Sequence, residues 1–153
     1  MKFIGLFLVL SLGISLAGSA PDPWTPANLL PPAELVSEIH LGQKTQGKKM
    51  EILYVGFGVL FRSKHIPESV YAGPGSKPEG IQKMRDAVKG LDRGTPIVLY
   101  CGCCPLDKCP NVRPAFAALK KDGFRNVRVL ELPQNFAEDW IAKGYPVVAG
   151  TKD

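Results

Sequence analysis

What most constrains the fold of this chain is an alternation of short apolar segments with segments of helical periodicity. The segment from Pro96 to Tyr100 is apolar at every position, which is typical of a strand buried on both faces of a parallel sheet. From Glu79 to Leu91, apolar residues instead recur every three or four positions, as they do along one face of a helix. Strands that alternate with helices of about a dozen residues predict an α/β domain with a mainly parallel central sheet flanked by helices.

The remaining segments continue this alternation. The pattern predicts a helix over 32–42, a strand over 50–56, a loop leading into a short strand at 69–71, a helix over 112–123, a strand over 126–132 and a last helix over 135–144. Gly42, Gly123 and Gly144 are expected to end the three helices, because glycine readily adopts the backbone conformation that ends a helix.

The N-terminus has the layout of a secretory signal peptide. Lys2 precedes an apolar run from Phe3 to Leu16, and small residues follow. The run is shorter than the roughly 20 residues that a spanning helix needs, so no stable membrane anchor is expected. We expect residues 1–19 to be a signal peptide, residues 20–32 an extended lead-in and residues 33–149 the folded domain. The sequence thus predicts an exported protein, periplasmic or secreted, in a compartment that oxidises thiols.

Composition and charge exclude two classes of protein. With 45% hydrophobic and 22% charged residues, the chain has the composition of a globular protein rather than a disordered one. Its net charge is +5, but the basic residues are scattered and no aromatic residues interleave with them. We therefore expect no nucleic-acid partner, and only a mild attraction for small anions.

All four cysteines, Cys101, Cys103, Cys104 and Cys109, lie in one short segment. A disulfide scaffold spreads its cysteines, because closing a longer loop gains more entropy, so this cluster indicates a site. Cys101 directly follows the apolar strand, and open parallel sheets bind ligands at the carboxyl ends of their strands. It also precedes a helix N-terminus, where amide donors and the helix dipole lower the pKa of a thiol. The cluster therefore predicts a reactive Cys101 thiolate.

Three motifs resemble those of the rhodanese domain family. The HIPES segment, residues 65–69, resembles a loop motif of that family, and IVLYC places Cys101 where the family carries its sulfur-accepting cysteine. Residues 130–147, LELPQNFAEDWIAKGYPV, resemble the closing motif, with Phe136 and Trp140 in register. The resemblance covers roughly residues 33–147 and implies a rhodanese-like fold. Trp24 is expected to pack the lead-in onto the domain, and His65 to make a backbone hydrogen bond.

The resemblance implies the activity of a sulfurtransferase, similar to thiosulfate sulfurtransferase. In that chemistry the Cys101 thiolate takes a sulfane sulfur, becomes a persulfide and passes the sulfur to a nucleophile. The expected partners are a small sulfur-containing anion or a thiol acceptor, together with a redox partner protein. The amide of Gly102 would hold the negative charge, and Lys108 and Arg113 would attract the anion.

Two departures from the family pattern leave the substrate open. YVGFG, residues 54–58, stands where the family usually has Asp-Val-Arg, and the loop from Cys101 to about Asn111 is nearly twice the usual length. Its extra cysteines permit a thiol–disulfide oxidoreductase, in which Cys103 or Cys104 bridges to Cys109 or attacks a modified Cys101. Alternatively, the four thiolates would hold copper or iron in a non-catalytic binding module. We favour persulfide chemistry on Cys101 without a cofactor, in which Cys103, Cys104 and Cys109 resolve or relay the sulfur.

Overall fold

The computed structural model describes residues 21–45 and 50–150, so the predicted signal peptide lies outside the described residues. At its centre is a sheet of five strands, all parallel, in the order β1-β5-β4-β2-β3. The strands are β1 (Leu29–Leu30), β2 (Glu51–Tyr54), β3 (Val70–Tyr71), β4 (Ile97–Tyr100) and β5 (Val127–Leu130). The predicted α/β architecture is confirmed, and the apolar strand β4 lies in the middle of the sheet.

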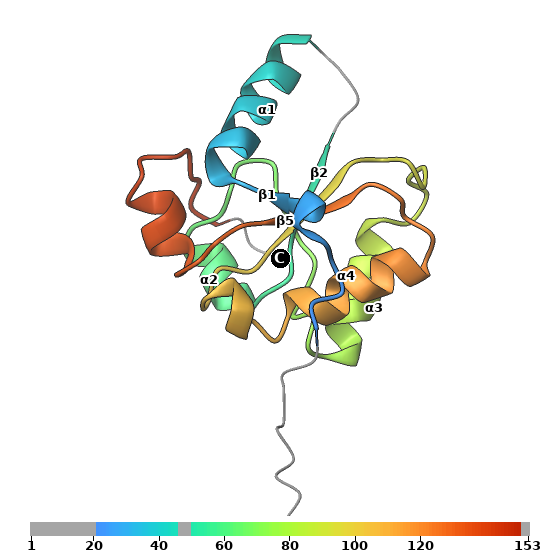
Figure 1. Ribbon diagram of the computed structural model, residues 1–153. Helices are drawn as coiled ribbons and strands as arrows, with labels where there is room; N and C mark the ends of the chain where they lie inside the picture. Colours follow the sequence, from blue (N-terminus) through green and yellow to red (C-terminus); the bar gives the residue numbers. More distant parts are fainter. Residues whose placement is uncertain (1–20, 46–49, 151–153) are drawn as a thin grey trace, which may run out of the picture.

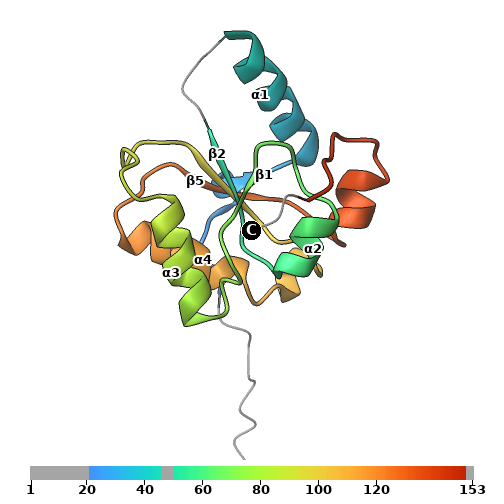
Figure 2. The same cartoon turned by 180° about the vertical axis from the view of Figure 1, so that it is seen from behind.

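Helices cover both faces of the sheet. They are α1 (Pro32–Thr45), α2 (Gly58–Ser63), α3 (Pro78–Ala87) and α4 (Val112–Lys121), with 3₁₀ turns η1 (Pro26–Asn28) and η2 (Leu106–Lys108) and the π-helical segment η3 (Ala137–Ile141). Figures 1 and 2 show α3 and α4 side by side on one side of the sheet, while α2 and η3 lie on the other. No helix among the described residues is long and apolar enough to cross a membrane.

Each face of the sheet buries its own apolar cluster. On one face, Leu99 of β4 packs with Met84 of α3 and Phe116 of α4. On the other face, Tyr100 packs with Phe61 of α2 and with Trp140 of η3. All four residues of β4 are buried, which is why the sequence shows an unbroken apolar run there rather than an alternating one.

Several helices differ from the sequence-based expectations. The last one, expected over 135–144, is the shorter π-helical segment η3. α1 continues past Gly42 to Thr45, because Gly42 does not adopt the positive φ with which a glycine ends a helix. α2 occupies part of the segment expected to be a loop; it is only six residues long, and Phe61 is its buried residue. The helix expected over 79–91 begins at Pro78 and ends at Ala87.

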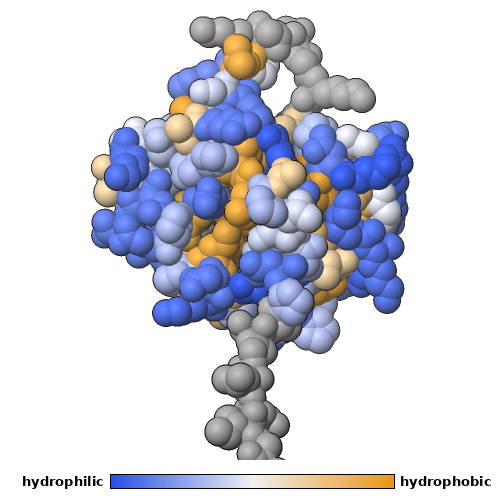
Figure 3. Space-filling model, in the orientation of Figure 1, coloured by the Kyte–Doolittle hydropathy of each residue, from blue (hydrophilic) through white to orange (hydrophobic). Residues whose placement is uncertain are grey.

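The lead-in contributes to the domain more than its proline content indicated. Leu29–Leu30 forms β1 and pairs in parallel with β5 at one edge of the sheet. Trp24 is 9% exposed and meets the ring of Phe116 edge-on at 5.6 Å between centroids. Packing of Trp24 on the domain is therefore confirmed. In the view of Figure 3, a narrow apolar band runs between hydrophilic side chains near the middle of the molecule, and smaller apolar patches lie apart from it.

Candidate functional site

Cys101 lies where the carboxyl ends of the neighbouring strands β4 and β2 come together. Tyr54 and Tyr100 end these strands in register, and their rings meet edge-on at 5.1 Å between centroids. The N–H of Val55 donates to the carbonyl of Tyr100 at 2.8 Å, so the pairing of the two chains extends to the start of the cysteine loop. Cys101 itself is 2% exposed. The predicted position of Cys101 at the carboxyl edge of a central strand is confirmed.

Gly102 turns the chain sharply after Cys101. Its φ is +75°, in the left-handed region that favours glycine, and its carbonyl accepts the N–H of Phe136 at 3.0 Å. A Cβ atom at Gly102 would lie 2.5 Å from Cβ of Phe136. Only glycine therefore fits between the cysteine loop and the chain just before η3.

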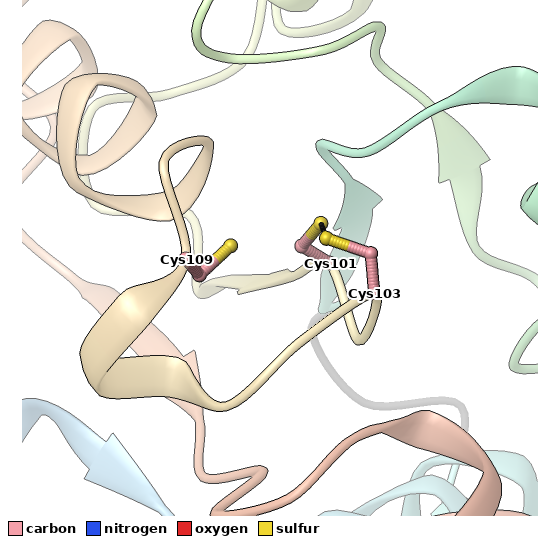
Figure 4. A group of neighbouring side chains, drawn as sticks. All are labelled: Cys101, Cys103 and Cys109. Atoms are coloured by element: carbon pink, nitrogen blue, oxygen red, sulfur yellow. Dashed lines mark hydrogen bonds between the residues drawn. The ribbon is translucent and has the colours of Figure 1, made fainter.

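Three of the four cysteine sulfurs form one group. The Sγ atoms of Cys101, Cys103 and Cys109 all lie within 4.8 Å of one another, and Figure 4 shows Cys109 pointing toward Cys101 from the opposite side of the loop. The Sγ atoms of Cys101 and Cys103 are 3.3 Å apart, as are those of Cys103 and Cys104. All four residues are free cysteines. Soft metals such as copper(I) favour a three-sulfur group of this kind.

The thiols of Cys101 and Cys109 shift the pKa values of one another in opposite directions. The neighbouring Cys101 thiol, aided by the backbone N–H groups of Asn111 and Val112 at the start of α4, lowers the pKa of Cys109 to about 6. The neighbouring Cys109, together with burial, raises the pKa of Cys101. The sequence predicts the lowered pKa at Cys101. That expectation is wrong for the resting site, because the first amides of α4 serve Cys109 instead.

Asn111 connects this pair of thiols to the rest of the fold. It is fully buried, its Nδ2 donates to Sγ of Cys101 at 3.4 Å, and its Oδ1 accepts the N–H of Ser76 at 3.1 Å. A buried amide with both ends paired holds a fixed orientation. Cys101 therefore has a hydrogen-bond donor on the side that faces α4.

The surroundings of Cys104 favour its neutral thiol. Burial is the main cause that raises the pKa of Cys104 to about 12, and the neighbouring sulfurs of Cys103 and Cys109 add to the effect. Cys104 is thus a neutral thiol at physiological pH. Its sulfur also stands outside the three-sulfur group.

A pocket of about 300 Å³ opens beside Cys101 and Cys103. Most of its wall is apolar, and its polar side chains come from the end of β2, from the end of α2 and the residue after it, and from the chain before η3. The lining residues are Tyr54, Leu60, Ser63, Lys64, Cys101, Gly102, Cys103, Asn135, Phe136, Ala137 and Ile141. The volume suits a small molecule, and Lys64 is the cationic residue of this lining.

The two cations predicted to attract an anion lie elsewhere. Lys108 is exposed and does not line the pocket. Arg113 donates to the carbonyl of Asp107 at 2.9 Å and to that of Cys109 at 3.2 Å, and it forms an ion pair with Asp22 at 2.6 Å. Arg113 therefore fixes the shape of the cysteine loop and ties it to the lead-in. A substrate-binding role for either cation stays a prediction.

Tyr54 and Lys64 are among the pocket residues that the sequence did not predict. Lys64 lies just before the HIPES segment, and Tyr54 is the last residue of β2. The position of Tyr54 carried a signal, because it lies near the end of a predicted strand and the carboxyl ends of parallel strands meet at one edge of the sheet. His65 hydrogen-bonds through Nδ1 with the carbonyl of Phe61 at 2.9 Å, as expected of it.

Comparison with known proteins shows likeness at the level of structure. No family model and no curated protein sequence matches the chain. The BH2092 protein from Bacillus halodurans matches with a TM-score of 0.53 and 21% identity, over 74% of each chain. The rhodanese-like domain of the Alr3790 protein from Anabaena sp. matches with a TM-score of 0.53 and 21% identity, over 82% of this chain and 88% of that one.

A larger protein contains the same fold. Thiosulfate sulfurtransferase from Pseudomonas aeruginosa matches with a TM-score of 0.56 and 17% identity, over 81% of this chain and 20% of that one. Sequence identities this low support a shared fold and nothing more specific. The rhodanese-like fold that the three sequence motifs predicted is confirmed.

Proposed function

We propose that this chain, which has a rhodanese-like fold, is a sulfurtransferase that carries sulfur as a persulfide on Cys101. The observation that carries the proposal is the placement of Cys101. It directly follows the central strand β4, lines a pocket of small-molecule size, and lies beside Cys109, whose pKa is lowered to about 6. Two coupled thiols lose their first proton as a pair, so that either can be the thiolate, and only the thiolate form of a cysteine is a good nucleophile.

The first half of the reaction consumes a sulfane-sulfur anion such as thiosulfate. The pair of Cys101 and Cys109 retains one proton, and when this proton lies on Cys109 the Cys101 thiolate attacks the outer sulfur of thiosulfate. A new S–S bond forms on Cys101 while the S–S bond of thiosulfate breaks, and sulfite leaves with the electron pair. The product is a Cys101 persulfide, and Lys64 at the pocket is the cation that would favour entry of the anion.

The second half passes the sulfur on. A thiolate or another nucleophile attacks the outer sulfur of the persulfide, and Cys101 leaves as the thiolate. The outer sulfur is transferred without a net change in the oxidation state of the protein. Because the pocket volume is about 300 Å³, a small thiol or an extended side chain of a partner protein fits this step.

Intact mass spectrometry tests the proposal directly. Wild-type protein, Cys101→Ser and Cys104→Ser are each reduced, freed of reductant, treated with thiosulfate and weighed. Cys104→Ser is the matched control, because Cys104 has a raised pKa and stands outside the three-sulfur group. We expect wild type and Cys104→Ser to gain one sulfur atom that a reductant removes, and Cys101→Ser to gain none. Equal uptake by Cys101→Ser would refute the assignment.

A thiol–disulfide oxidoreductase is the second candidate, and one distance favours it. Sγ of Cys103 lies 3.3 Å from Sγ of Cys101, so Cys103 is placed to attack a Cys101 that is bound in a mixed disulfide. That attack forms a Cys101–Cys103 disulfide and releases the other thiol. This candidate predicts that the reduced protein reduces a chromogenic disulfide and that Cys103→Ser stops at the mixed disulfide. A Cys103→Ser variant that turns over like wild type would exclude it.

Export and partner proteins belong to the same proposal. We propose that residues 1–19 direct export and are removed, which N-terminal sequencing of the protein recovered outside the cytoplasm would test. In an oxidising compartment the four free thiols need a source of electrons. A thiol-containing redox partner would then keep Cys101 and Cys109 reduced between turnovers.

A further inference from the structure

The hydroxyl group of Tyr54 has no hydrogen-bond partner, although it is buried. Among the described residues it is the only buried side-chain nitrogen or oxygen atom in this condition. Tyr54 is 2% exposed. Burying a hydroxyl without a partner is unfavourable, and native structures contain few such groups. An unpaired hydroxyl in the wall of a pocket therefore indicates a group that meets its partner only when the pocket is in use.

The Tyr54 hydroxyl lies beside the sulfur of Cys101. Both atoms border the space that a side chain at Gly56 would occupy: a Cβ atom added there would lie 2.5 Å from Oη of Tyr54 and 2.8 Å from Sγ of Cys101. Gly56 belongs to the YVGFG segment, where the rhodanese family usually has Asp-Val-Arg. The lack of a side chain at Gly56 is what allows the hydroxyl and the sulfur to approach one another.

The neighbouring tyrosine, Tyr100, is also buried, but its hydroxyl group is hydrogen-bonded. The Oη atom of Tyr100 accepts the N–H of Ile66 at 3.1 Å and shares a hydrogen bond with Oγ of Ser69 at 3.0 Å. Both tyrosines end adjacent strands and both are buried, yet only Tyr100 is paired. The difference is that Tyr100 points at the HIPES loop, whereas Tyr54 borders the pocket and Cys101.

We propose that the Tyr54 hydroxyl is a catalytic hydrogen-bond donor to the anionic outer sulfur of the Cys101 persulfide. This inference rests on the proposed sulfurtransferase function. In the resting site the hydroxyl has no hydrogen-bond partner, and a thiol is only a weak acceptor. Sulfur uptake breaks the S–S bond of the donor, releases sulfite and leaves a negative charge on the outer sulfur, which is a strong acceptor.

The environment keeps the hydroxyl in its donating form. Burial is the main cause that raises the pKa of Tyr54, so the group stays protonated across the physiological range. A donor that is already in place and engages only the charged intermediate favours that intermediate over the resting state. Tyr54 would thereby fill the role of charge stabilisation that the sequence analysis gave to the amide of Gly102.

The test compares Tyr54→Phe with Tyr71→Phe. Tyr71 belongs to the same aromatic group, 6.3 Å from Tyr54 between ring centroids, but it does not line the pocket. Each protein is loaded with thiosulfate, and the absorbance of the persulfide anion is followed against pH. Transfer of its sulfur to cyanide is then timed. In Tyr54→Phe we expect the persulfide to ionise at a pH about one unit higher than in wild type, which is about a ten-fold loss of anion stabilisation. Tyr71→Phe should match wild type.

The outcomes separate this inference from the function on which it rests. If all three proteins take up sulfur and the persulfide of Tyr54→Phe ionises as in wild type, the role of Tyr54 is refuted and the sulfurtransferase proposal stands. If wild type takes up no sulfur, both are refuted. A Tyr54→Phe variant with a lowered unfolding midpoint would show a partner for the resting hydroxyl and would also count against the inference.

Discussion

The two buried tyrosines at the site give a sharp prediction about stability. Replacing Tyr100 by Phe removes the acceptor of the buried N–H of Ile66, at 3.1 Å, and the hydrogen bond with Ser69, at 3.0 Å. Leaving a buried donor unpaired costs about 1–3 kcal/mol. Replacing Tyr54 by Phe removes a hydroxyl that has no partner, so that change should leave the free energy of unfolding unchanged or raise it.

The two variants are measured by urea and thermal unfolding under reducing conditions. Both lose one oxygen atom and keep the ring, so the volumes that they remove from the core are the same. For a domain of this size, about 1 kcal/mol corresponds to roughly 2–8 °C in Tm. We expect Tyr100→Phe to melt at least that far below Tyr54→Phe. Equal midpoints, or a lower midpoint for Tyr54→Phe, would show that the hydrogen bonds of these two hydroxyl groups do not differ as described.

Three further predictions concern the chemistry of the site. Lys64→Gln should raise the KM for thiosulfate several-fold in a steady-state assay. Lys108→Gln makes the same change outside the pocket and should leave the KM unchanged. Equal effects of the two substitutions would show that Lys64 does not bind the substrate. The thiolate of Cys109 is present above its pKa of about 6 and is lost as the pH falls through that value. Sulfur uptake should therefore fall over the same pH range, and it should need a higher pH in Cys109→Ser. An unchanged pH profile in that variant would contradict the sharing of a proton between Cys101 and Cys109. Under anaerobic titration the reduced protein should bind copper(I) and lose sulfur uptake. Copper binding should be abolished in Cys103→Ser and kept in Cys104→Ser, because Cys103 belongs to the three-sulfur group and Cys104 does not. Unchanged copper binding by Cys103→Ser would exclude the three-sulfur group as the ligand set.

Much of the fold could be predicted because the strands that form its centre follow from local patterns. β4 is buried at all four positions, and an unbroken apolar run bounded by turn residues is typical of such a central strand. The short elements were harder. β1 is two residues long and follows a proline-rich stretch, and α2 is six residues long with a single buried residue, Phe61. Segments of this length carry too few periodic positions to indicate their structure, and tertiary packing decides it.

The site was predictable in its location and less so in its electrostatics. The end of β4 and the cysteine cluster are contiguous in sequence, so Cys101 could be placed at once. Which thiol receives the amides of α4 depends on the path of the loop, and the structure gives them to Cys109. Arg113 was expected to be a substrate cation because no local signal shows that Asp22, far away in the chain, pairs with it. Tyr54 and Lys64 are likewise far from Cys101 in the sequence, and only the folding of the chain brings them to the site.

The order of the strands also affects how this protein resists aggregation and how it can bind partner proteins. Both edges of its sheet are formed by strands of only two residues, β1 and β3, while the three longer strands lie between them. A long exposed edge is a template for strand addition and for aggregation, and very short edge strands remove that template. Partners that exchange sulfur or electrons with the cysteines are therefore expected to engage side chains around the pocket rather than extend the sheet.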